Sequence, residues 1–201
     1  MKYIYLKNII DFLLAILIFI IFLPLLIVIS FLVYLNLGTP IFFIQERPGY
    51  KGKIFKLIKF RTMKNIYDLN NALVSDENRQ SKLGNWLRKT SLDEIPELIN
   101  IILGQMSFVG PRPLLCEYLN LYSPKQFSRH NVKPGITGFA QINGRNRITW
   151  DEKLSYDFYY TKNISFWLDI KILFKTIIVI FSQNGINHKD HVTMPRFKGN
   201  K

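Results

Sequence analysis

An uncharged apolar stretch near the N-terminus constrains this chain more than any other feature. No charged residue occurs between Asp11 and Glu46, and the run 12–35 is almost entirely aliphatic or aromatic. A helix needs about 20 apolar residues to cross the hydrocarbon core of a membrane, so this run is long enough. It is longer than the apolar part of a signal peptide, and no small-residue cleavage site follows it. We therefore expect a membrane helix in residues 1–36 and a separate domain in residues 37–201.

The path of this helix through the membrane has two interpretations. Pro24 removes one backbone hydrogen bond and clashes with the preceding turn, which predicts a kink. Basic residues, which prefer the cytoplasmic face, flank the run on both sides, with Lys2 and Lys7 before it and five lysines and arginines in the range 51–61 after it. The segment is re-entrant if both flanks lie on one face, and a kinked single span otherwise. Asp11, at the edge of the run, is expected either at the interface or paired with a base such as Lys7.

The rest of the chain is strongly basic. The formal net charge is +13, and 25 of the 27 lysines and arginines follow Glu46. Such a surface favours anionic partners, namely phospholipid headgroups, phosphorylated substrates or nucleic acid. The single cysteine, Cys116, excludes an internal disulfide. The three histidines lack zinc-ligand spacing relative to it, and there is no P-loop or dinucleotide-binding fingerprint.

Short apolar segments alternate with glycine- and proline-rich loops after the first helix, which predicts an α/β fold, mainly helical with a small sheet. We expect strands over 40–45 and 53–61, helices over 83–89, 92–103, 114–122, 150–160 and 166–181, and loops over 104–113 and 134–147. The basic amphipathic helix 83–89 suits either the membrane surface or a core position. The last helix has too short an uncharged run to span a membrane, so it should pack in the core or lie at the interface.

Two adjacent acids, Asp93 and Glu94, are the first candidates for chemistry. Ser91 and Glu94 fit a capping box, and Pro96 is tolerated in the first turn of a helix, so both acids are expected at a helix N-terminus. The positive end of a helix stabilises carboxylates and nearby phosphate groups. One acid can then attack phosphorus while the other moves a proton or orients Mg²⁺ on a diphosphate. The alternative is that both acids only stabilise the helix end.

Basic residues in loops and strands are candidates for phosphate binding. Arginine suits this role because it donates two parallel hydrogen bonds to phosphate. Each such residue, taken singly, is typical of a solvated surface. Together with the membrane segment and the acid pair, they indicate a substrate that is both phosphorylated and lipidic. The candidates are Lys59, Arg61, Arg88, Arg112, Arg145 and Arg147.

Six motifs together carry a resemblance to a known family. They are Gln45-Glu46-Arg47-Pro48-Gly49, Lys59-Phe60-Arg61-Thr62-Met63, Ser91-Leu92-Asp93-Glu94, Met106-Ser107-Phe108-Val109-Gly110-Pro111-Arg112-Pro113, Pro134-Gly135-Ile136-Thr137-Gly138 and Gln141-Ile142-Asn143-Gly144-Arg145. In this order and spacing, the sequence resembles the bacterial sugar transferase family, the small monotopic phosphoglycosyl transferases. The C-terminal segments 159–166 and 185–201 are similar to members that transfer diacetylbacillosamine phosphate in bacterial protein N-glycosylation.

The resemblance implies a reaction and a site. A sugar-1-phosphate passes from a UDP-sugar to undecaprenyl phosphate. Asp93 is implied as the nucleophile on the β-phosphate, giving a phosphosugar-enzyme intermediate and releasing UMP. The family's glutamate, here Glu94, is implied in proton transfer or acceptor activation, and Mg²⁺ is expected at Asp93. Arg112 and Arg145 fall in motifs that line the family's site.

The resemblance also implies a location. The membrane element of the family is a re-entrant helix broken near a proline, which Pro24 matches. With interfacial amphipathic helices, it places a compact catalytic domain on the cytoplasmic face of the bacterial inner membrane. The implied partners are inner-membrane phospholipids and downstream glycosyltransferases, and no nucleic acid. Two positions depart from the family. Leu23 replaces a serine whose hydroxyl could satisfy a freed carbonyl, and Asn8 replaces an arginine near Asp11.

The sequence leaves the sugar and one alternative function open. The C-terminal resemblance favours UDP-N,N'-diacetylbacillosamine, with UDP-GalNAc, UDP-GlcNAc and UDP-galactose as alternatives. A membrane-anchored basic module that binds acidic lipid or nucleic acid without catalysis would have the same anchor and the same net charge. Such a module would not need Asp93, and its binding would weaken steeply with salt.

Overall fold

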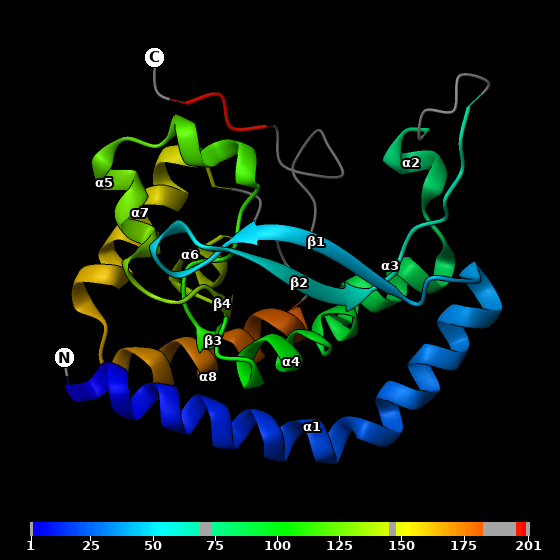
Figure 1. Ribbon diagram of the computed structural model, residues 1–201, viewed down its shortest axis with the longest axis horizontal. Helices are drawn as coiled ribbons and strands as arrows, with labels where there is room; N and C mark the ends of the chain where they lie inside the picture. Colours follow the sequence, from blue (N-terminus) through cyan, green and yellow to red (C-terminus); the bar gives the residue numbers. More distant parts are fainter. Residues whose placement is uncertain (1, 69–73, 145–147, 183–195, 200–201) are drawn as a thin grey trace.

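A single 36-residue helix, α1 (Lys2–Leu37), runs along one side of the remaining chain and bends partway along its length (Figure 1). The computed structural model describes residues 2–68, 74–144, 148–182 and 196–199. The elements after α1 are β1 (Phe42–Pro48), the 3-10 turn η1 (Tyr50–Gly52), β2 (Ile54–Phe60), α2 (Asp76–Arg79), α3 (Lys82–Thr90), the 3-10 turn η2 (Leu92–Glu94), α4 (Glu97–Ile102), β3 (Ser107–Val109), the 3-10 helix η3 (Cys116–Leu121), α5 (Pro124–Phe127), the 3-10 helix η4 (Ser128–Asn131), β4 (Gly135–Thr137), α6 (Phe139–Ile142), α7 (Trp150–Asn163) and α8 (Phe166–Ser182). The expected fold, mainly helical with small sheets behind a long apolar helix, is confirmed.

Two small sheets hold the domain together. β1 and β2 form an antiparallel hairpin in which Phe42 pairs with Phe60. β3 and β4 form a parallel pair inside segments that the sequence analysis expected to be loops. Glycine makes this pair possible, because a Cβ on Gly135 would lie 2.1 Å from the backbone nitrogen of Gly110. The expectation of loops there was wrong because three-residue strands carry no detectable periodicity.

Two expected helices differ from the structure. The segment 92–103 is divided into η2 and α4, with Pro96 at the N-cap of α4. Proline cannot donate a backbone hydrogen bond, so the α-helix begins only after it. The segment 114–122 contains the tighter 3-10 helix η3 instead of an α-helix.

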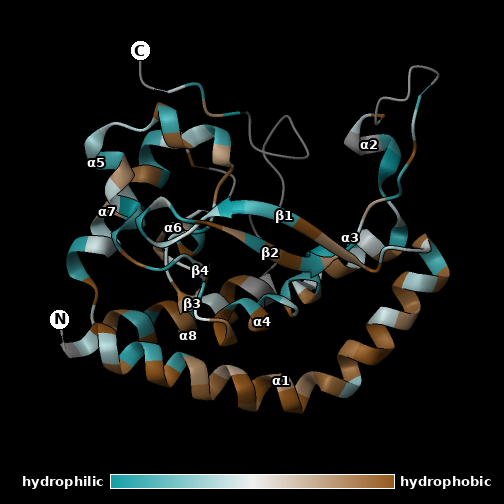
Figure 2. Cartoon of the chain, in the orientation of Figure 1, coloured by the Kyte–Doolittle hydropathy of each residue, from teal (hydrophilic) through white to brown (hydrophobic). Residues whose placement is uncertain are grey.

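α1 is apolar all round, and only one of its faces packs on the domain. Ala15 joins a core cluster with Leu57 and Leu98, and Ile29 joins a second with Phe60. The opposite face leaves many large apolar side chains exposed. In Figure 2, α1 is mostly brown after its mixed N-terminal turns. A helix that is hydrophobic on every side requires an apolar environment on its uncovered face. By length and composition α1 can cross a membrane.

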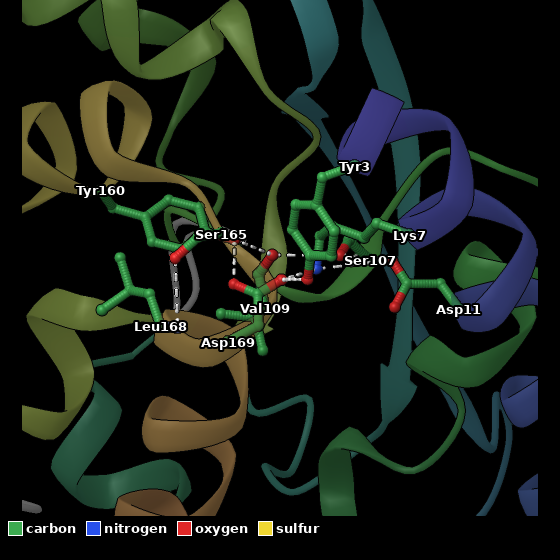
Figure 3. Close-up of polar contacts among 9 residues, drawn as sticks. All are labelled: Tyr3, Lys7, Asp11, Ser107, Val109, Tyr160, Ser165, Leu168 and Asp169. Carbon is green, nitrogen blue, oxygen red and sulfur yellow. Dashed lines mark hydrogen bonds and ion pairs between the residues drawn. The ribbon is translucent and has the colours of Figure 1, made fainter. Parts of the chain in front are cut away.

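The N-terminal end of α1 is tied to α8 by a buried polar network (Figure 3). The Lys7 ammonium group lies 2.7 Å from Asp169 Oδ2, which also accepts a hydrogen bond from Tyr3 at 2.6 Å. Asp11 is buried, accepts a hydrogen bond from Ser107 at 2.6 Å, and lies 3.7 Å from Lys7. Asp11 was expected either at the interface or paired with a base, and in the structure it is paired with Lys7.

The C-terminal end of α1 is held by Arg61. This guanidinium donates to the carbonyl oxygens of Leu37, Gly38 and Thr39, the last at 2.9 Å. The last carbonyls of a helix have no partner within the helix, and a cation at that end also interacts favourably with the helix dipole. Both ends of α1 therefore contact the same domain.

Candidate active site

Asp93 and Glu94 lie in a tight turn between two helices. α3 ends at Thr90, and Ser91 adopts a left-handed backbone conformation (φ 57°, ψ 19°) that leads directly into η2. The Ser91 side chain makes no capping hydrogen bond, so the predicted capping box is wrong. The Glu94 side chain is instead bound by cations from other elements. The acids therefore occupy a 3-10 turn ahead of α4.

Glu94 is the most firmly held of these acids. Its Oε1 accepts hydrogen bonds from Lys59 Nζ and Arg112 Nη2, each at 2.6 Å. Burial by itself raises the pKa of Glu94, but the attraction of Arg112 and Lys59 outweighs burial and holds this pKa well below its usual range. Glu94 is therefore a fixed, ionised carboxylate at neutral pH.

Glu97 joins this cluster, although the sequence analysis did not single it out. Its side chain is 2% exposed, and its Oε1 lies 3.0 Å from Lys59 Nζ. Burial raises the pKa of Glu97 to about 7, a rise that Lys59 opposes and Glu94 reinforces. Its position three residues after Glu94 could have indicated that the two acids lie together, because residues three apart share a helix face.

Lys59 reaches both acids because β2 is fixed beside α4. Asn100 of α4 is fully buried, accepts a hydrogen bond from the backbone nitrogen of Ile58 at 3.1 Å, and donates one to the carbonyl of Lys56 at 2.7 Å. This amide bridge fixes the position of the strand that carries Lys59.

Asp93 is held much less firmly than Glu94. It is half-buried and makes no hydrogen bond or ion pair with any residue that the structure describes. Burial and the neighbouring charge of Glu94 raise the pKa of Asp93 to about 6, against the attraction of the surrounding cations. A carboxylate that is ionised near neutral pH and has no internal partner can act as a nucleophile or a metal ligand.

A cavity of about 420 Å³ opens beside Glu94. Glu94, Arg88 and Arg112 contribute to its polar lining, and Ile18 and Phe22 of α1 contribute to its apolar lining. The volume falls within the range of small-molecule sites, about 300–1,000 Å³. The lining is amphipathic and includes part of the long apolar helix.

The structure brings together three of the six predicted phosphate-binding residues. Lys59 and Arg112 meet at Glu94, and Arg88 lines the same cavity, with its Nε 2.9 Å from Thr62 Oγ1. Arg61 does not join them, because its guanidinium is engaged at the end of α1. The remaining two, Arg145 and Arg147, lie outside the described residues.

A buried ion pair at the cavity was also missed. Arg129 Nε and Nη2 lie 3.0 and 2.8 Å from Asp157 Oδ2, and Nη2 donates to the carbonyl of Arg112 at 2.7 Å. Arg129 and Asp157 are 3% and 1% exposed, and both line the cavity together with Lys153. The hydrogen bond from Arg129 to the carbonyl of Arg112 fixes the backbone from which the Arg112 side chain reaches Glu94.

Comparison with known proteins assigns the family. Residues 2–183 match the family model described as bacterial sugar transferase. The chain belongs to the bacterial sugar transferase family. This confirms the family expected from the six motifs, and with it the expectation of an enzyme of the phosphoglycosyl transferase class.

The individual relatives are not all named for the same sugar. The uncharacterized sugar transferase EpsL of Bacillus subtilis is 52% identical over 167 residues, which are 83% of each chain. A UDP-glucose:undecaprenyl-phosphate glucose-1-phosphate transferase of Escherichia coli is 41% identical, covering 86% of this chain and 39% of its own length. A UDP-N-acetylgalactosamine-undecaprenyl-phosphate N-acetylgalactosaminephosphotransferase of Aeromonas hydrophila is 34% identical, covering 91% of this chain and 45% of its own. The chain thus spans less than half the length of these two relatives.

Proposed function

We propose that this protein transfers a sugar-1-phosphate from a UDP-sugar to undecaprenyl phosphate in two steps. A carboxylate oxygen of Asp93 attacks the β-phosphorus, the bond to the bridging oxygen breaks, and UMP leaves with the electron pair. The lipid phosphate then attacks the phosphosugar on Asp93 and regenerates the carboxylate. The observation that carries this proposal is the contrast between the two acids, because Glu94 is fixed by Lys59 and Arg112 while the adjacent Asp93 has no such restraint.

The lining of the cavity supports a lipid phosphate as acceptor. Ile18 and Phe22 bring the apolar surface of α1 to the same cavity that Arg88 and Arg112 line with positive charge. An isoprenoid phosphate has this same division between an apolar chain and an anionic head. The names of the Escherichia coli and Aeromonas hydrophila relatives both include undecaprenyl phosphate.

Mg²⁺ fits this site as a cation bound together with the substrate. Among the described residues, no group of three or more histidine, cysteine, aspartate and glutamate side chains gathers around a metal position. Mg²⁺ is commonly held by one or two carboxylates plus substrate phosphates. Asp93, which has no internal partner among the described residues, is the carboxylate we propose for it. The cation would neutralise charge on the diphosphate.

We further propose that α1 is re-entrant and that the domain lies on the cytoplasmic face of the inner membrane. Lys7 binds Asp169 at one end of the helix, and Arg61 binds the carbonyl of Leu37 and the two carbonyls that follow it at the other, so one domain holds both ends. A straight span would separate these ends by the full thickness of the hydrocarbon core, about 30 Å. The exposed apolar face between them would then dip into one leaflet.

The sugar we propose is N,N'-diacetylbacillosamine, and this choice rests on the C-terminal motif alone. Relatives are named for glucose, galactose and N-acetylgalactosamine. A panel of UDP-sugars, supplied one at a time, tests the choice directly.

UMP release by the full chain in nanodiscs tests the reaction. The assay contains undecaprenyl phosphate, Mg²⁺ and each UDP-sugar, with Asp93→Asn as the inactive variant. Asp151→Asn removes an exposed acid from α7 and is the matched control. We expect release that requires lipid, metal and Asp93. Folded wild-type protein that releases no UMP with any sugar would refute the transferase proposal. Salt-sensitive binding of anionic vesicles without turnover would then support an anchored basic module.

A further inference from the structure

Glu97 is a buried acid to which the proposed reaction gives no role. Its side chain is 2% exposed, and it is not among the residues that line the cavity. Its Oε1 lies 3.0 Å from Lys59 Nζ, the only hydrogen-bond or ion-pair partner of this side chain within the described part of the chain. Burying an acid is costly unless a partner compensates it, so this contact constrains both side chains.

Helix α4 holds strand β2 at two points. Glu97 and Asn100 are three residues apart on α4 and both are buried, so they present one polar face of the helix to the strand. Asn100 bonds the strand backbone at Lys56 and Ile58. Glu97 binds the side chain of Lys59, the residue that follows. One helix therefore fixes both the strand that carries Lys59 and the ammonium group at the end of its side chain.

The second point matters because lysine is flexible. Its ammonium group ends a four-carbon stem, and holding that stem in one conformation costs side-chain entropy. Lys59 Nζ lies 2.6 Å from Glu94 Oε1 and 3.0 Å from Glu97 Oε1, so two acids restrain it. Its side chain is 16% exposed, and without Glu97 it could turn toward water.

The position of Lys59 determines how Glu94 is held. Lys59 Nζ and Arg112 Nη2 both bind the same oxygen of Glu94, Oε1, each at 2.6 Å. Within the described part of the chain, no donor binds the other oxygen, Oε2. Since Glu94 lines the cavity, Oε2 is available to a ligand there. A shift of Lys59 would release one of the two bonds that orient this carboxylate.

We propose that Glu97 is a positioning residue that acts through Lys59 on the orientation of Glu94. This inference rests on the proposed function. The acceptor oxygen of Glu97 keeps the Lys59 ammonium group against Glu94 Oε1, so that Oε2 keeps one orientation toward the substrates during both steps. Without this restraint the Glu94 carboxylate samples unproductive orientations, and a misplacement of about 1 Å can cost about 100-fold in rate.

Turnover of the full chain in nanodiscs tests this role. It is measured as UMP release with undecaprenyl phosphate, Mg²⁺ and a UDP-sugar that the wild type accepts. Glu97→Met removes the acceptor and should lower kcat about 10- to 100-fold, the value of a hydrogen bond to a charged group. KM for the UDP-sugar should change by less than about threefold, because Glu97 does not line the cavity.

Two further variants serve as the rescue and the control. Glu97→Gln keeps an acceptor oxygen for Lys59 and should recover most of the lost kcat. Glu117→Met removes an exposed glutamate, whose nearest cation is 3.6 Å away on Arg196, and should change neither kcat nor KM. Thermal unfolding of each variant shows that the protein is folded, so a fall in kcat at unchanged Tm reports the site.

A double variant tests whether Glu97 acts through Lys59. Lys59→Met alone leaves both acids without this cation, whereas Lys59→Met combined with Glu97→Met also removes the more deeply buried acid. If Glu97 works only by holding Lys59, then Glu97→Met should lower kcat no further once Lys59 has been replaced.

Two results would overturn the inference while leaving the transferase intact. One is a wild-type kcat in folded Glu97→Met protein. The other is an equal loss of kcat from Glu97→Met with and without Lys59, which would mean that Glu97 acts independently of it. By contrast, a wild type that releases no UMP with any UDP-sugar would refute the proposed function itself.

Discussion

Removing the cation from the contact between Lys7 and Asp169 should destabilise the protein by about 3–5 kcal/mol, the cost of leaving one partner of a buried ion pair alone. The two charged atoms lie 2.7 Å apart, and their side chains are only 9% and 6% exposed. Asp169 is also hydrogen-bonded by Tyr3 and Tyr160, at 2.6 and 2.7 Å, so it cannot turn to solvent easily. Lys7→Met would therefore leave its carboxylate buried and uncompensated.

Thermal unfolding in nanodiscs measures this effect. For a domain of this size, 1 kcal/mol corresponds to about 2–4 °C, so Lys7→Met should lower Tm by at least about 6–12 °C. Lys171→Met removes an exposed lysine from α8 and should shift Tm by no more than about 2 °C.

A double variant decides whether the loss comes from this pair. Lys7→Met combined with Asp169→Leu removes both charges, so its loss should be smaller than the sum of the two single losses. Asp11, 3.7 Å from Lys7, loses its neighbouring cation in either case, so the recovery should be partial. Simple additivity of the two losses would refute the reasoning.

Three further variants test packing, buried charge and the site. Gly84→Ala should lower Tm relative to the exposed-site variant Lys82→Ala, because a Cβ on Gly84 would lie 1.8 Å from the carbonyl oxygen of Thr62. Burial lowers the pKa of His130 from 6.5 to about 4, so the unfolded chain takes up a proton first and stability falls with decreasing pH. His130→Gln should remove about 2 kcal/mol of the loss between about pH 7 and pH 5, measured by denaturant titration. Glu94→Gln should lower the rate of UMP release at least about 100-fold.

For each of these variants, one result would contradict the prediction. A Gly84→Ala protein as stable as wild type would mean that α3 does not approach the carbonyl oxygen of Thr62 as closely as the structure shows. If wild type and His130→Gln lose the same amount of stability in acid, groups other than His130 take up the protons. Wild-type UMP release by Glu94→Gln would leave the central carboxylate of the cluster without a role in the reaction.

Elements with long periodic patterns could be predicted, and elements fixed by distant contacts could not. α1 was predicted almost to its ends from the length of its uncharged apolar run, and α7 and α8 were predicted to within three residues of their ends. β3 and β4 are three residues long and become strands only because Gly110 and Gly135 let the two backbones approach. That pairing joins residues 28 positions apart, which a local pattern cannot reveal.

The candidate site shows the same division. Asp93 and Glu94 are adjacent in a recognisable motif, and Lys59 and Arg112 lie in motifs as well. Asp157, by contrast, resembles any solvated acid on an amphipathic helix. Its burial depends on Arg129, 28 residues earlier in the chain. Only the folded chain shows that this pair belongs to the lining of the cavity.

The membrane helix belongs to the site as well as to the anchor. Ala15 and Ile29 of α1 each take part in a core cluster, and Ile18 and Phe22 line the cavity. Removing α1 would therefore expose two clusters and open one wall of the active site. A helix that served only as a tether could be exchanged for another apolar segment of equal length. Here the inner face of α1 is shaped to the domain while its outer face leaves many large apolar side chains exposed. Under the proposed function, the position of α1 at the membrane would also determine where the lipid phosphate can reach Asp93.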